Sequence, residues 1–479
     1  MTVAMKFGGS SVADADAIKR VASIVERQRA QSAGAPSPVV VVSALGGVTD
    51  RLIEAARLAE EGDGAHATAV LHALFERHVA VATALTAGAA QAQLVAKIRD
   101  EFDELIGLVH ALAVLHEVSP RSLDAVLAAG EVVSSRIVAA ALTSQKIPAV
   151  WIDARTIVVT DVEHTAALPD MGATRERVSR LLAPVVKRGE VAVLGGFIGA
   201  TPNGVTTTLG RGGSDYSAAI VGACLDVDEI QIWTDVDGML TADPRIVPQP
   251  AVVPRLSFAE ASELAYFGAK VLHPSTILPA VSNNIPVRIV NSRRPDNPGT
   301  LITADVRQPA GGLTAIACKR DVTVIDITST RMLMAHGFLR RVFEVFERFK
   351  TAVDVVTTSE VSVSVTVDDV RRLDAIVDNL KNFAEVGIEP EMAIVCIVGE
   401  NLRSDPTLFS RSVTALDRIP LRLVSQAASR RNITFVLRDS DVTAAMGRLH
   451  EEFFRAPAAY HDGTEHHDAT KNHETTMKS

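Results

Sequence analysis

Hydrophobic and polar positions along the first 305 residues alternate between two periods. Short β-branched runs such as Val39–Val42 are typical of strands that are buried on both faces of a sheet. Between such runs lie longer amphipathic segments, and residues 50–145 have an almost wholly helical pattern rich in alanine. Apolar runs that predict further strands occupy residues 150–152, 191–194 and 230–233. Because strands alternate with helices, we expect an α/β domain with a mostly parallel sheet and helices on both faces.

A different pattern begins after residues 308–312, whose Gln-Pro-Ala-Gly-Gly sequence is typical of a linker. Two rounds of strand, helix, paired strands and helix follow in residues 321–379 and 393–454, and they predict two ferredoxin-like βαββαβ units. The strand expected at residues 312–320 could pair with the second unit. The expected boundaries are residues 1–305, 312–392, 393–457 and, for a polar disordered tail without periodicity, 458–479.

The composition narrows the range of functions. The chain has 479 residues, with 48 basic and 57 acidic side chains, and its formal net charge of −9 argues against a nucleic-acid surface. No uninterrupted apolar stretch reaches the ~18 residues that span a bilayer, and no secretory signal pattern opens the sequence. The three cysteines lie far apart in apolar stretches, which favours a reducing compartment. We therefore expect a cytoplasmic protein without a membrane partner.

Three short segments carry the candidate chemistry. Residues 6–11 are Lys-Phe-Gly-Gly-Ser-Ser, residues 210–215 are Gly-Arg-Gly-Gly-Ser-Asp, and residues 233–238 are Trp-Thr-Asp-Val-Asp-Gly. Glycine leaves backbone N–H groups exposed and tolerates positive φ angles, so such loops can approach a polyphosphate closely. They follow predicted strands, and ligands of α/β sheets bind beyond the carboxyl ends of the strands. The pattern predicts a nucleotide-binding protein.

Charged residues at the edges of these loops suggest specific contacts. Lys6 could meet the β- and γ-phosphates of ATP, although a solvated lysine beside a tight turn has the same pattern. Arg211 could clamp a carboxylate through two parallel hydrogen bonds, and a plain glycine-rich surface loop is the alternative. Asp215 lies at the start of a predicted helix, where anions are favoured. An acidic residue there could orient Lys6 or organise a metal-phosphate group.

Later segments leave alternatives open. Thr234 and Asp235, with Arg245, could bind a nucleotide or simply form a strand-to-turn ending. Lys270 adjoins a helix break, and His273 before a proline is better explained as a structural histidine than as a general base. The sequence contains no P-loop, no Gly-x-Gly-x-x-Gly dinucleotide fingerprint, no Gly-x-Ser-x-Gly elbow and no His-Glu-x-x-His metal pair.

Together, these segments resemble the aspartokinases of the amino-acid kinase family. The resemblance covers residues 3–457, and the order and spacing of its motifs are specific. Besides the three glycine loops, the matching segments are residues 43–49, 130–131, 195–197 and 267–274. The C-terminal repeat is similar to the paired ACT domains by which this family senses end-product amino acids. Leu240 departs from the pattern, because many relatives carry a tyrosine there.

The resemblance implies phosphorylation of the β-carboxylate of L-aspartate by ATP, the first step toward lysine, threonine and methionine. Mg²⁺ would arrive with ATP, and no protein metal site is implied. Lys6 and Asp215 would be catalytic. The implied substrate-binding residues are Thr49, Glu131, Phe197, Arg211, Gly212, Gly213 and Ser214. The implied ATP-binding residues are Lys6, Gly8, Gly9, Ser43, Thr234, Asp235, Arg245 and Lys270.

The regulatory half resembles that of lysine-responsive members. The implied effector residues are Met332, Leu339, Val353 and Asp354, and Asp354 would pair with the effector's ammonium group. Ala335 and Ala352 stand where small hydroxyl residues are associated with lysine sensitivity, so lysine and threonine both stay open as effectors. Edge strands of ACT units pair across subunits, and we expect a homodimer or homotetramer.

Two other functions stay open. A kinase of this family could act on glutamate or N-acetylglutamate, but Glu131 and the C-terminal repeat favour an acceptor with a free α-amino group. The protein could also be an amino-acid sensor that keeps an inactive kinase fold. The joint presence of Lys6, Arg211 and Asp215 argues against that loss of activity.

Overall fold

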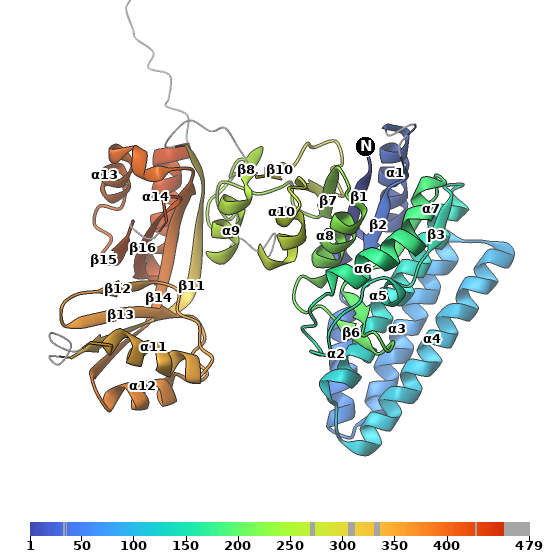
Figure 1. Ribbon diagram of the computed structural model, residues 1–479, viewed down its shortest axis with the longest axis horizontal. Helices are drawn as coiled ribbons and strands as arrows, with labels where there is room; N and C mark the ends of the chain where they lie inside the picture. The colour runs from blue at the N-terminus through green and yellow to red at the C-terminus, as the bar shows by residue number, and fades with distance from the viewer. Residues whose placement is uncertain are drawn as a thin grey trace, which may run out of the picture.

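The computed structural model describes residues 1–31, 34, 36–268, 274–304, 312–329, 336–426 and 429–454 (Figure 1). The expected tail at residues 458–479 and most of the expected linker lie outside these residues. Figure 1 shows a parallel sheet with its helices on one side of the molecule and an antiparallel sheet with its helices on the other. This arrangement is the fold class expected from the sequence.

The N-terminal domain is built on an eight-stranded sheet of order β3-β4-β2-β1-β7-β9-β10-β8. Every neighbouring pair is parallel except β9 and β10, which run antiparallel. The strands are β1 Val3–Phe7, β2 Val39–Val42, β3 Ala149–Trp151, β4 Val191–Gly195, β7 Glu229–Thr234, β8 Arg255–Ser257, β9 Val287–Asn291 and β10 Thr300–Thr303. The hairpin β5 Ile198–Ala200 and β6 Thr206–Thr208 lies beside the sheet.

Helices bury both faces of this sheet, which explains its uniformly apolar strands. Val40 and Val42 pack into the hydrophobic core that contains α1 to α4, whereas Val39 and Val41 pack into the core that contains α8. The helices are α1 Ala15–Gln31, α2 Val48–Glu60, α3 Gly64–Leu85, α4 Gly88–Leu115, α5 Pro120–Ser144, α6 Met171–Arg177, α7 Ala183–Lys187, α8 Gly213–Leu225, α9 Phe258–Tyr266 and α10 Leu278–Ser282.

Helix α5 is the central helix of this domain. Among the described helices it is the one that is long and apolar enough to cross a bilayer by length and composition, but 78% of its apolar window is buried inside the protein. Its buried positions include two acidic residues, Asp124 and Glu131. Their burial in a core helix indicates that they serve a defined purpose there.

The C-terminal region forms one six-stranded antiparallel sheet of order β12-β13-β11-β14-β16-β15. Its strands are β11 Leu313–Thr328, β12 Val356–Thr358, β13 Ser362–Val367, β14 Glu385–Gly399, β15 Leu421–Ser425 and β16 Asn432–Arg438. Its helices are α11 Phe338–Arg348, α12 Leu373–Lys381, α13 Pro406–Ala415 and α14 Val442–Phe454. Two separate hydrophobic cores form, one with α11 and α12 and the other with α13 and α14.

Strands β11 and β14 run through both units, and their halves belong to different cores. Ile316 packs with α13 and α14, whereas Ile325 packs with α11 and α12. The sequence therefore predicted two strands, one at residues 312–320 and one that begins at residue 321, where the structure has one continuous strand, because polar residues 319–321 interrupt the apolar alternation. The structure carries the strand across them with an irregularity of pairing in which Asp321 adopts a φ of 57°.

The two sheets are joined through α9. Its Leu264 shares a hydrophobic core with Ala315 of β11 and Ile394 of β14. Figure 1 shows α9 between the two halves of the molecule. Short 3₁₀ turns lie at Gly9–Ser11, Ala154–Thr156, Pro274–Ile277, Leu402–Ser404 and Asp439–Asp441, and a π-helical turn lies at Val178–Leu182.

Candidate functional site

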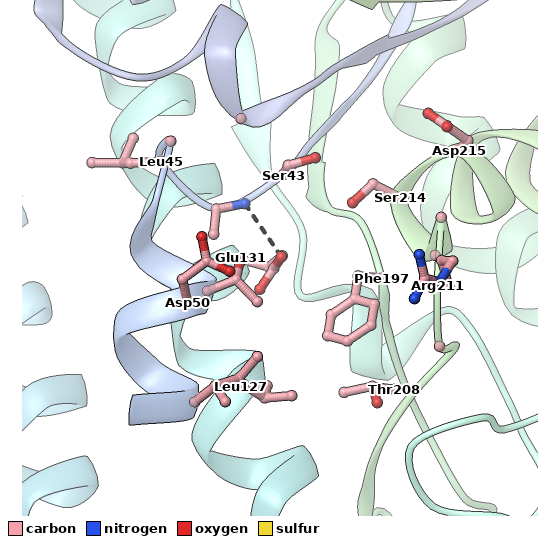
Figure 2. Close-up of a pocket in the computed structure, with 18 of the residues that line it drawn as sticks. Ser43, Leu45, Asp50, Leu127, Glu131, Phe197, Thr208, Arg211, Ser214 and Asp215 are labelled. Atoms are coloured by element: carbon pink, nitrogen blue, oxygen red, sulfur yellow. Dashed lines mark hydrogen bonds between the residues drawn. The ribbon is translucent and has the colours of Figure 1, made fainter. Parts of the chain in front are cut away.

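A cavity of about 570 Å³ lies beyond the carboxyl ends of β1, β2 and β4. Ligands of α/β sheets bind in this position. The cavity brings together segments that are far apart in the sequence, and Figure 2 draws 18 of its lining residues and labels ten of them. The predicted site residues that line it are Lys6, Gly9, Ser43, Thr49, Glu131, Phe197, Arg211, Gly212, Gly213, Ser214 and Asp215.

Lys6 and Asp215 form an ion pair at one edge of the cavity. Lys6 Nζ lies 2.7 Å from Asp215 Oδ1, and the side chains are 12% and 14% exposed. Lys6 projects from β1, and Asp215 lies in the first turn of α8. A Cβ atom on Gly8 would lie 3.5 Å from Lys6 Nζ, which is an ordinary van der Waals distance, so the ammonium group does not require glycine at this position. The N–H of Gly8 donates to Trp233 O at 3.1 Å and is therefore used within the fold.

Arg211 lies on a loop whose backbone requires glycine. Gly210 and Gly212 adopt φ angles of 74° and 70°, a region that other residues rarely occupy. A Cβ atom on Gly213 would lie 2.6 Å from Phe197 Cδ2. Arg211 itself is exposed and makes no ion pair with any residue that the structure describes. Its guanidinium group is available to bind an anion in the cavity.

Glu131 enters the cavity from α5, opposite Arg211 (Figure 2). The residue is 3% exposed, and Ala44 N–H donates to its Oε1 at 3.3 Å. Its Oε2 is buried and has no hydrogen-bond partner in the described part of the chain. Burial raises the pKa of Glu131 to about 8, against the smaller opposing effect of the hydrogen bond from Ala44. A cation bound beside Oε2 would complete this site.

Phe197 lies between Glu131 and Arg211 (Figure 2). It adopts a φ of 67°, which is strained for a bulky residue, and its N–H donates to Ser217 Oγ at 2.9 Å. Strain of this kind persists where the surroundings fix it, often at functional sites. The aromatic ring therefore forms a fixed wall between an acidic and a basic group.

Other predicted nucleotide residues lie outside this cavity. Thr234 ends β7, the strand that pairs with β1, and Asp235 follows it, but neither residue lines the cavity. Arg245 lines a second cavity of about 230 Å³ together with Leu240, and forms an ion pair with Asp243. Lys270, like His273, lies outside the described residues.

Three of the four predicted effector residues lie within the described residues. Met332 lies outside the described residues, Leu339 is 40% exposed on α11, and Val353 is half-buried. Asp354 accepts hydrogen bonds at Oδ1 from Lys319 Nζ at 2.8 Å and from the Tyr266 hydroxyl at 2.9 Å. Lys319 of the chain itself thus forms an ion pair with the carboxylate that was expected to bind an effector.

Sequence reasoning missed several residues of the first cavity. Asp50, Leu127, Thr165 and Thr208 also line it, and Asp124 lies behind the two threonines. One signal was present in the sequence. The helical spacing of residues 124, 127 and 131 puts two carboxylates and a leucine on one face of α5. No group of three or more metal-ligating side chains was found where the structure describes residues.

This chain is similar in sequence to known protein families and to individual proteins. The sequence matches a family model of the amino acid kinase family over residues 1–291 and an ACT domain model over residues 395–453. Aspartokinase 1, chloroplastic, of Arabidopsis thaliana is 36% identical over 471 residues, which cover 95% of this chain and 81% of that protein.

Two solved structures of one bacterial enzyme are also similar. E. coli aspartokinase III in complex with aspartate and ADP, in the R-state, is 33% identical with a TM-score of 0.81, covering 95% of this chain and 100% of that one. The same enzyme in complex with lysine and aspartate, in the T-state, is 33% identical with a TM-score of 0.78 and the same coverage, 95% and 100%.

Proposed function

The chain belongs to the aspartokinases of the amino acid kinase family, and we propose from this premise that it transfers the γ-phosphoryl group of ATP to the β-carboxylate of L-aspartate. The products are the acyl phosphate, 4-phospho-L-aspartate, and ADP. The family resemblance inferred from the sequence is confirmed by the two family models and the aspartokinase relatives. The observation that carries the proposal is the cavity in which Glu131, whose Oε2 has no partner among the described residues, faces Arg211 across Phe197.

An amino acid matches the two charged walls of this cavity. We propose that Glu131 binds the α-ammonium group and that Arg211 binds the α-carboxylate through its planar guanidinium group. Thr49 and Ser214 would add hydroxyl contacts at the lining of the same cavity. The side-chain carboxylate of aspartate would then point toward the Lys6 and Asp215 edge.

The chemistry requires positioning and charge neutralisation more than proton transfer. The aspartate side chain has an ordinary pKa of about 3.9, so it is ionised at neutral pH and needs no general base. One of its oxygens attacks the γ-phosphorus while the bond to the β–γ bridging oxygen breaks, and the electron pair leaves with ADP. Lys6 reduces the repulsion between the two anions, and Asp215 holds the Lys6 ammonium in place.

Nucleotide binding is proposed along the ends of β1 and β7. The phosphates would lie near Lys6, Gly9 and Ser43, and the base would lie toward the second cavity beside Arg245. Mg²⁺ that arrives with ATP would neutralise phosphate charge. The carboxylate of Asp215 and the hydroxyls near it are oxygen donors of the kind that Mg²⁺ prefers.

We further propose that the C-terminal units bind an amino-acid effector. Lysine is the first candidate, because the E. coli relative was solved in complex with lysine. Strands β12 and β15 are the edges of the six-stranded sheet and could pair with a second copy, which supports a homodimer or homotetramer. All three cysteines are free thiols, and we propose a reducing compartment such as the cytoplasm.

The function is tested by measuring ADP formation from Mg-ATP with L-aspartate, L-glutamate or no acceptor. We expect ADP only with aspartate. Lys6→Met should lower kcat by about 10²-fold or more, since it removes charge stabilisation in the transition state. Lys19→Met, which changes an exposed lysine of α1, is the matched control.

Two other outcomes would indicate a different function for this protein. ADP formation with glutamate alone would indicate a kinase of another acidic amino acid. Absence of turnover with every acceptor, together with tight lysine binding, would indicate an amino-acid sensor.

A further inference from the structure

Asp124 is a buried carboxylate that has no place in the reaction proposed above. It lies on α5, two helical turns before Glu131, and its side chain is 0% exposed. Its Oδ1 accepts hydrogen bonds from the Thr208 hydroxyl at 2.6 Å and the Thr165 N–H at 3.0 Å. Its Oδ2 accepts from His164 Nδ1 at 2.6 Å.

The donors to Asp124 come from two segments that border the arginine loop. Thr208 ends β6, shortly before Gly210. The Thr165 carbonyl oxygen lies only 3.1 Å from the position that a Cβ atom on Gly210 would take, so the two backbones are packed together. Both threonines also line the cavity. Asp124 therefore fixes the segment before Arg211 and the segment that packs against it.

The backbone of these segments needs such an anchor. Thr165 adopts a φ of 70°, which is unfavourable for a β-branched residue. A loop rich in glycine has many accessible conformations, and ordering it costs conformational entropy. If the loop is already ordered, substrate binding does not bear that cost. Hydrogen bonds to a buried carboxylate are strong enough to hold both segments in place.

We propose that Asp124 is a positioning residue for the amino-acid substrate. Through Thr208 and Thr165 it holds Arg211 opposite Glu131, so that one helix supplies the ammonium-binding carboxylate and also fixes the carboxylate-binding loop. The identity of the substrate as aspartate rests on the proposed function. The positioning role rests on the geometry of the Asp124 network.

The first test removes the Thr208 hydroxyl without changing side-chain volume. Thr208→Val should raise KM for aspartate about tenfold, the effect of losing one hydrogen bond to a charged group, and leave KM for ATP unchanged. Thr208→Ser keeps the hydroxyl and should stay within about twofold of the wild type. Thr143→Val removes a threonine hydroxyl of α5 that donates to Ala139 O, and serves as the control.

The second test asks whether the effect passes through Arg211. In an Arg211→Ala background, Thr208→Val should change aspartate affinity by less than about twofold, because the two residues act in one chain of contacts. Affinity is measured by aspartate-induced thermal stabilisation as well as by KM. Should Thr208→Val not fold, Asp124→Asn is measured against the same background.

The outcomes separate this inference from the proposed function. The positioning role is overturned if Thr208→Val lowers aspartate affinity by the same factor in both backgrounds, or if it raises KM for ATP as much as KM for aspartate. It is also overturned if Thr208→Ser raises KM for aspartate as much as Thr208→Val does. The kinase function is contradicted, and the positioning role is retained, if the variants show the expected coupling in aspartate affinity but the wild-type protein forms no ADP.

Discussion

Two buried carboxylates in this protein were each expected to bind the ammonium group of an amino acid, and their surroundings differ. Glu131 in the first cavity of the N-terminal domain is 3% exposed, and its Oε2 has no partner within the described ranges. The Asp354 side chain in the C-terminal sheet is 2% exposed, and its Oδ1 is bound by Lys319 and Tyr266. Glu131 has no cationic partner among the described residues, whereas Asp354 is paired with Lys319.

The pKa shifts of Glu131 and Lys319 agree with this difference in pairing. Burial raises the pKa of Glu131 to about 8, so its carboxyl group is mostly neutral at pH 7 until a cation arrives. For Lys319, burial lowers the pKa, but hydrogen bonds to Asp354 and Asp368 outweigh it and the net shift is upward. Lys319 is therefore charged at neutral pH. An effector that used Asp354 would have to compete with Lys319 or bind the second oxygen of the carboxylate.

The largest effect is expected from removing the charge of Glu131. Glu131→Gln keeps the shape and the hydrogen bond from Ala44 but cannot form an ion pair with the α-ammonium group. We expect KM for aspartate to rise on the order of 10²-fold, with little change in KM for ATP. Glu54→Gln on α2, a partly exposed residue paired with Arg51, is the control. Equal rises in both KM values would remove Glu131 from the substrate site.

The next effect is the pH dependence of aspartate binding. Glu131 must lose its proton to pair with the ligand, so binding at pH 7 should release about one proton, and affinity should rise more than about tenfold from pH 6 to pH 8. Calorimetry in two buffers of different ionisation enthalpy measures the release. Glu131→Gln should abolish it, and a release that survives in this variant would point to another group.

The same shift predicts the stability of the ligand-free protein. The folded-state pKa of about 8 lies above the ordinary value of 4.5. The contribution of Glu131 to the free energy of unfolding therefore falls as the pH rises from about 4.5 to about 8. Thermal unfolding should show that the melting temperature of Glu131→Gln rises relative to that of the wild type between pH 5 and pH 9.

Sequence patterns predicted the sheet and the glycine loops for a local reason. A strand buried on both faces must be apolar throughout, and a loop with positive φ angles needs glycine at fixed positions. Contacts between distant segments could not be read in this way. Asp124 was missed because its partners Thr165 and Thr208 lie on other elements, and only their folded positions reveal the network. The Lys319 contact with Asp354 depends equally on distant pairing within the C-terminal sheet.

The smallest effect is expected at the regulatory carboxylate. Lys319→Met leaves Asp354 without its cation and should lower the melting temperature, since an unpaired buried charge is unfavourable. If the effector supplies an ammonium group to Asp354, lysine should stabilise this variant more than it stabilises the wild type. Differential scanning fluorimetry with increasing L-lysine measures both changes. Threonine, which has no side-chain ammonium group, is tested alongside.

The Lys319→Met result can be interpreted only beside a variant that removes an uncharged partner of the same oxygen. Tyr266→Phe removes the hydroxyl that donates to Asp354 Oδ1 and leaves the Lys319 ion pair in place. It should therefore change the lysine response much less than Lys319→Met. Because Tyr266 ends α9 of the catalytic domain, an equally large change would mean that the effector acts on the contact between domains and not on the charge of Asp354. An unchanged response in both variants would place the effector away from Asp354.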